Sequence, residues 1–138
     1  MRKLTKIEQA NADALGEAAT FHVTATILNK NIQDCNVAIR DLLKREGVLD
    51  YDTLNAGDKV TLEGVYNDGT ETRVSAYRAK TRGDKRIWFN GLKSHAEAGD
   101  VMALVIRSGK LVIQNVTKGI AVAVFVIPSL DTMAKLSF

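Results

Sequence analysis

A hairpin pattern near the middle of the chain places the strongest constraint on its fold. Residues 59–66 read KVTLEGVY and residues 71–79 read ETRVSAYRA, and Asn-Asp-Gly at 67–69 separates them. Alternating apolar and polar residues on both sides of an Asp-Gly turn are typical of an antiparallel β-hairpin with one buried face. We therefore predict a mainly β protein and expect neighbouring segments to extend the same sheet.

Short strands are predicted on both sides of this hairpin, at residues 20–28, 86–89, 101–107, 110–116 and 120–127. Apolar spacings of three and four predict two helices, at 5–19 and 37–45, and a single helical turn falls between 90 and 100. Because consecutive strands are joined by short turns, the pattern favours an antiparallel barrel or sandwich over a parallel βαβ fold. The expected fold is an open antiparallel barrel of seven strands with two or three helices.

Composition limits the chain to one domain, residues 1–138, with the barrel at about 20–128. Its 138 residues are 46% hydrophobic and 25% charged, a balance that excludes a disordered chain. The single cysteine, Cys35, excludes a disulfide scaffold. No signal-peptide pattern is visible, and the apolar segment 120–127 is too short to span a bilayer. We expect a cytoplasmic protein that does not enter a membrane.

The sequence shows no constellation typical of an enzyme. Cys35, His22 and His95 are too far apart for a zinc motif, and both histidines are interpreted as solvated surface side chains. No acidic residue is followed two positions later by lysine on a predicted strand, as a metal-dependent nuclease centre would need. No nucleophile elbow or Walker loop is present. We therefore expect no catalysis, no metal and no cofactor.

The distribution of charge is more informative than its total. Formal net charge is only +3, yet the window 73–93 contains seven basic residues and one acidic residue, a net of +6. The rest of the chain has 12 basic and 15 acidic residues, a net of −3. A concentrated basic segment on a slightly acidic domain is the pattern expected of a protein that binds a phosphate backbone.

Two points about this window stay open at the sequence level. The cations could form an ordinary solvated face that Asp50, Asp52 or Glu71 neutralises across the fold. Trp88 alternates with Ile87 and Phe89, so it could face either the core or a ligand.

The order of elements resembles that of the DNA-binding pseudobarrel family. The resemblance rests on IRDLLKREGVLDYDTLNAGD (39–58) and YRAKTRGDKRIWFNGLKSHAEAGDVMAL (77–104), about a third of the chain. The family includes the plant B-three transcription-factor domains and the recognition or effector domains of restriction endonucleases such as BfiI and EcoRII. The added helix predicted at 5–19 has no evident counterpart in that family.

The resemblance implies an open barrel that grips the major groove of double-stranded DNA with two arms. The first arm is the polar segment after the first strand, with Asn29, Lys30, Asn31 and Gln33. The second arm follows the hairpin, with Arg78, Lys80, Thr81, Arg82, Lys85 and Arg86. Arg73 joins these candidate DNA-binding residues through the charge of the window.

Two functions of different classes follow. The first is a sequence-specific double-stranded DNA-binding module, such as the recognition or effector domain of a restriction-modification system, associated with or fused to a nuclease subunit. The alternative is a phage or bacterial protein-interaction or structural barrel that docks an acidic partner through its basic face. Whether RNA would also be accepted is left open.

Overall fold

The computed structural model describes residues 2–119 and shows a single curled, open sheet of seven strands. The prediction of a mainly β, seven-stranded open barrel with two or three helices is confirmed, although the sheet is mixed and not purely antiparallel. The elements follow one another as α1 (Lys6–Asp13), β1 (Ala19–His22), α2 (Ala25–Lys30), β2 (Ile32–Asp34), α3 (Val37–Arg45), η1 (Tyr51–Thr53), β3 (Lys59–Tyr66), β4 (Glu71–Arg78), β5 (Lys85–Phe89), η2 (Leu92–Ser94), β6 (Val101–Arg107) and β7 (Lys110–Asn115).

The strands are ordered β1-β6-β7-β3-β4-β5-β2 across the sheet. Neighbours pair antiparallel except for β3 and β7, which run parallel over residues 64–66 and 111–113. Parallel neighbours need a long connection, and here β4, β5, η2 and β6 supply it. The predicted hairpin is present as β3 and β4, which pair from Lys59 opposite Tyr77 to Val65 opposite Glu71.

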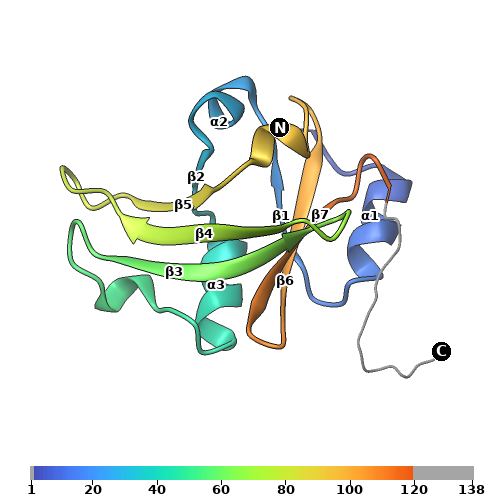
Figure 1. The fold of residues 1–138 in the computed structure, drawn as a ribbon. Helices are drawn as coiled ribbons and strands as arrows, with labels where there is room; N and C mark the ends of the chain where they lie inside the picture. The colour runs from blue at the N-terminus through green and yellow to red at the C-terminus, as the bar shows by residue number, and fades with distance from the viewer. Residues whose placement is uncertain (1, 120–138) are drawn as a thin grey trace.

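The sheet curls so that strands far apart in its order share one core. Phe21 on β1 and Phe89 on β5 stack with ring centroids 5.3 Å apart, although four strands separate β1 from β5 in the sheet. Helix α3 lies behind β3 and β4 in Figure 1 and inserts Ile39, Leu42 and Leu43 into the curl, each at most 1% exposed. Burial of this apolar surface between α3 and the inner face of the sheet stabilises the curled arrangement.

The N-terminal helix packs on the opposite face of the sheet. It begins with the predicted capping box of Thr5 and Glu8 and ends at Asp13, shorter than the predicted span of 5–19. Ala12 packs against Val101 and Ala103 on β6 in a second, smaller core. Gly16 follows in a left-handed conformation, with φ of +99°, which a continuing helix does not allow.

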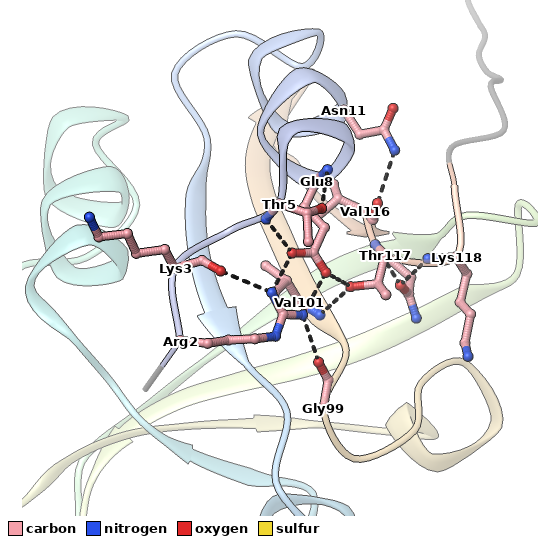
Figure 2. A network of polar contacts seen from close by, with 11 residues as sticks. Arg2, Lys3, Thr5, Glu8, Asn11, Gly99, Val101, Val116, Thr117 and Lys118 are labelled. Carbon is pink, nitrogen blue, oxygen red and sulfur yellow. Dashed lines mark hydrogen bonds and ion pairs between the residues drawn. The ribbon is translucent and has the colours of Figure 1, made fainter.

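A buried carboxylate fastens this helix to the sheet, and Figure 2 shows its contacts. Glu8 is 2% exposed and receives two hydrogen bonds from the Arg2 guanidinium, at 2.6 and 2.7 Å. The Thr117 hydroxyl, which also accepts a bond from the Val101 amide, donates to the same carboxylate at 2.6 Å. These hydrogen bonds hold the pKa of Glu8 far below its usual range, and those from Arg2 have the largest effect.

Two predicted strands need comment. The strand predicted at 20–28 is wrong beyond His22, because the Thr24 hydroxyl caps α2 by accepting from the Ile27 amide at 3.2 Å. The apolar residues of Ala-Thr-Ile-Leu at 25–28 fit the spacing of a strand as well as that of a helix. The N-cap and the burial of Ile27 favour the helix. The strand predicted at 120–127 lies outside the described residues, and β2 is the strand that the prediction missed.

Candidate nucleic-acid interface

The turn between β4 and β5, residues 79–84, carries Lys80 and Arg82 of the basic window. It lies one residue earlier than predicted, since β4 stops at Arg78 and not Ala79, and β5 starts at Lys85 and not Arg86. The Ala79 amide donates to the Asp84 carbonyl and the Gly83 amide to the Ala79 carbonyl, each at 2.9 Å. Gly83 has φ of +72°, a left-handed conformation that favours glycine. The turn is the loop at the far left of Figure 1 between β4 and β5.

Arg78 points into the protein from the end of β4. Its Nε donates to the Tyr51 carbonyl at 2.9 Å, and its Nη1 donates to the Gly83 carbonyl at 2.8 Å. Its Nη2 lies 3.7 Å from the Asp52 carboxylate, and only 21% of the side chain is exposed. The guanidinium therefore joins the turn to η1.

Carboxylates from three segments lie among the other cations of the second arm. Asp52 on η1 also pairs with Lys85 at 3.4 Å. Asp84 in the turn lies 3.3 Å from Arg82 and 3.2 Å from Arg86, and Asp34 on β2 lies 3.7 Å from Arg86. Four of the seven basic residues of the window thus share three carboxylates.

This pairing lowers the local charge without cancelling it. Asp34 and Asp52 lie outside the sequence window, so seven basic residues now stand against three acidic ones, a net of +4. Of the three acidic residues considered as neutralising partners, Asp52 contacts the basic window, whereas Asp50 pairs with Lys44 and Glu71 with Lys110.

The outer part of the turn remains available to a ligand. Lys80 and Thr81 are exposed, and the Arg82 side chain is 77% exposed despite its contact with Asp84. Arg73 and Lys93 are also exposed, and like Lys80 they form no ion pair within residues 2–119. Charged groups in such positions can reach a phosphate backbone at little cost in lost internal contacts.

The first arm is not a simple loop. Asn29 and Lys30 are exposed in the last turn of α2, and Asn31 ends that helix in a left-handed conformation with φ of +57°. The Asn31 Oδ1 is buried without a hydrogen-bond partner in the described part of the chain. Gln33 lies on β2, half-buried, with its amide donating to the Asp34 carbonyl at 2.8 Å.

Strand β5 runs between the outer ends of the two arms, and Gln33 on β2 lies opposite Ile87 in its middle. The Phe89 amide donates to the Asn31 carbonyl at 2.8 Å, so the first arm meets one end of β5, while the turn leaves from the other end at Lys85. Arg73 lies at the first-arm end, because its carbonyl accepts from the Asn90 amide at 3.2 Å. With a strand rise of about 3.3 Å per residue, the two ends of β5 are about 13 Å apart.

Trp88 lies between the arms on the solvent side of the sheet. Its neighbours Ile87 and Phe89 are fully buried, so Trp88 points the other way and is half-buried. The strand register places it between Ile32 on β2 and Ser75 on β4. The structure thus resolves the choice left open by the sequence, because Trp88 faces away from the core.

A hollow of about 440 Å³ opens beside the second arm. Asp34, Cys35, Arg40, Arg78, Gly83, Asp84 and Lys85 line it. Arg40 donates to the Cys35 carbonyl at 2.7 Å, which leaves the guanidinium at the start of α3 and close to the basic turn. The hollow is polar and shares its residues with the second arm, so we treat it as part of the same surface.

Neither histidine is simply a solvated side chain, contrary to the expectation from the sequence. His95 stacks on Tyr66 with ring centroids 3.8 Å apart, and only 15% of its side chain is exposed. His22 is half-buried on β1, and its Nε2 is buried without a partner in the described residues. Residues 2–119 contain no group of three or more His, Cys, Asp or Glu side chains placed to hold a metal ion.

Comparisons with protein-family models, curated proteins and solved structures find no match to this chain. Among the helices of residues 2–119, none combines the length and apolar character needed to cross a membrane.

Proposed function

We propose that this chain is a sequence-specific double-stranded DNA-binding module, of the kind that serves as the recognition or effector domain of a restriction-type system. The observation that carries the proposal is the placement of two polar, basic projections at opposite ends of one short strand. Arg73, Asn29 and Lys30 lie at one end of β5, and Lys80 and Arg82 lie at the other.

The spacing and chemistry of the two projections support this function. The separation of about 13 Å along β5 is close to the width of the B-DNA major groove, about 12 Å. Asn side chains can form paired hydrogen bonds with adenine, and arginine can do so with guanine. Lysines at the same positions would contact phosphates and fix the register of the protein on the duplex.

The first test is the salt dependence of duplex binding. Fluorescence anisotropy with a 20-base-pair duplex at a series of salt concentrations should show an affinity that falls linearly on a log-log plot, because phosphate contacts release counterions. Selection of bound duplexes from a randomised pool should then enrich one motif. Absence of binding at the lowest salt concentration would refute the proposal.

Arg82→Ala tests the contact itself. If Arg82 reads a base, the substitution should weaken binding to the selected motif by about 1–3 kcal/mol and relax specificity at one position. Arg107→Ala is the matched control, because Arg107 is exposed at the end of β6, outside the basic window, and its guanidinium donates to the Leu15 carbonyl. Equal losses in the two variants would contradict a role for the turn.

The same two measurements distinguish DNA binding from the alternative function, which is the docking of an acidic protein. If the protein instead docks an acidic protein, it should bind any polyanion weakly and in a salt-dependent way, and the selection should enrich no duplex motif. The mixed ion pairs of Asp34, Asp52 and Asp84 with the basic turn are compatible with such a partner.

A further inference from the structure

The β4–β5 turn has little internal support for a segment that would recognise DNA. Two backbone hydrogen bonds close it, and its outer residues Lys80, Thr81 and Arg82 are exposed. A turn held only in this way would have to lose conformational freedom on binding, which weakens affinity.

Arg78 supplies the missing support from inside. Its bond to the Gly83 carbonyl fixes the left-handed corner of the turn, and its bond to the Tyr51 carbonyl fixes that corner to η1. Tyr51 is itself 3% exposed, and its hydroxyl donates to the Arg86 carbonyl at 2.7 Å. The turn is therefore connected through Arg78 to the buried core.

Asp52 completes the arrangement. Its carboxylate lies 3.7 Å from Arg78 and 3.4 Å from Lys85, the residues that flank the turn on its two sides. Asp52 is exposed, so the ion pairs contribute less than the two hydrogen bonds to backbone carbonyls.

We propose that Arg78 is a positioning residue that holds the β4–β5 turn in its binding conformation and does not itself contact the nucleic acid. The proposal rests on the proposed function and changes the role expected of Arg78 from the sequence. To reach a phosphate, the guanidinium would have to give up its bonds to both the Tyr51 and Gly83 carbonyls. The planar fork of arginine can hold these two acceptors at once, whereas the point charge of lysine cannot reproduce the geometry.

Arg78→Lys separates positioning from contact because it keeps the charge and removes the fork. Duplex affinity should fall about tenfold in this variant, while the slope of log affinity against log salt stays that of the wild type. Lys80→Gln is the matched control within the turn, because Lys80 is exposed. It should lower the magnitude of that slope by about 0.9, the value for one lost phosphate contact on B-DNA. Arg78→Gln should behave as Arg78→Lys does.

Hydrogen exchange measured without DNA tests the same role independently. The Ala79 and Gly83 amides, which close the turn, should exchange about tenfold faster in Arg78→Lys and at the wild-type rate in Lys80→Gln. Asp52→Asn leaves both carbonyl bonds in place and should give a smaller increase, which keeps the test usable if Arg78 variants fold poorly.

The outcomes distinguish the two proposals. Unchanged exchange in Arg78→Lys, or a slope reduced by about 0.9 in Arg78→Gln with unchanged exchange, would overturn the positioning role. Failure of the wild-type protein to bind duplex would instead overturn the proposed function, and the exchange data would still decide how the turn is held.

Discussion

At the scale of single residues, Glu8 shows how one buried charge is made stable. Its carboxylate accepts from Arg2, Thr5 and Thr117, so every neighbouring donor favours the ionised form. A buried carboxylate without such donors would have a raised pKa, because burial disfavours charge. Here the hydrogen bonds outweigh burial, and the pKa of Glu8 is lowered.

Glu8→Gln should therefore destabilise the protein in a pH-dependent way. The folded pKa lies below the unfolded value of about 4.3, so the stabilisation is present above that pH and is lost as pH falls toward the folded pKa. Urea unfolding should show a loss of about 1.5–3 kcal/mol at pH 7, because hydrogen bonds to a charged group are removed. The difference from wild type should shrink steadily between about pH 5 and pH 2.

Glu17→Gln is the control for this experiment, because the Glu17 side chain is 87% exposed and its ion pair with Arg45 is long, at 3.9 Å. Its unfolding free energy should differ from wild type by less than about 0.5 kcal/mol at every pH. A Glu8→Gln deficit that stays constant with pH would show that the ionisation of Glu8 does not stabilise the fold.

At the scale of elements, β3 is the strand that joins the antiparallel part of the sheet to its one parallel pairing within residues 2–119. It pairs with β4 along its length and with β7 over its last three residues, where the pairing becomes parallel. Gly64 lies at the start of that parallel region, opposite both Thr72 and Leu111. A glycine there lets the strands approach closely on a crowded face.

Gly64→Ala should destabilise the sheet by about 1–3 kcal/mol through overpacking. A Cβ at this position would lie 3.2 Å from the Leu111 carbonyl oxygen, 3.2 Å from Thr72 Cγ2 and 3.3 Å from Ile113 Cδ1. Thermal unfolding compared with Thr61→Ala, at an exposed position of the same strand, would measure the effect. Equal stability of the two variants would show that the strands can separate to admit a methyl group.

At the scale of the whole molecule, the lone cysteine reports on the integrity of the core. Cys35 is 3% exposed in the cluster that joins α3 to β5, and burial raises the pKa of its thiol to about 11. The reactive species is the thiolate, so the native thiol is protected both by its pKa and by its packing.

Labelling of Cys35 by a thiol reagent at pH 8 should be at least about a hundredfold slower in native buffer than in denaturant, where the thiol pKa returns to about 8.5. The slow rate should increase with urea in parallel with unfolding, since the half-barrel must open to expose the thiol. Rapid labelling of the native protein would indicate that the region around the start of α3 opens locally.

The hairpin, the helix at 37–45, the basic window and the mainly β class could be predicted from the sequence because each depends on local patterns. The alternation of KVTLEGVY and ETRVSAYRA around Asn-Asp-Gly gives β3 and β4 without knowledge of the remaining chain. The cations of the second arm could likewise be found by their charge, which is a property of composition within a short window, whereas the first-arm residues came only from the family resemblance.

Tertiary structure decided which element some segments form and which residues the side chains of the candidate interface contact. Thr24 and Ile27 lie in a pattern suited to a strand, and packing together with a helix cap made them part of α2. Asp34 and Asp52 come from other segments and meet the second arm only in the folded chain, which lowers its charge, and the Tyr51 carbonyl and Asp52 hold Arg78 inward. Local patterns fix the period and charge of a segment, whereas ion pairs and buried contacts depend on residues brought together from distant parts of the sequence.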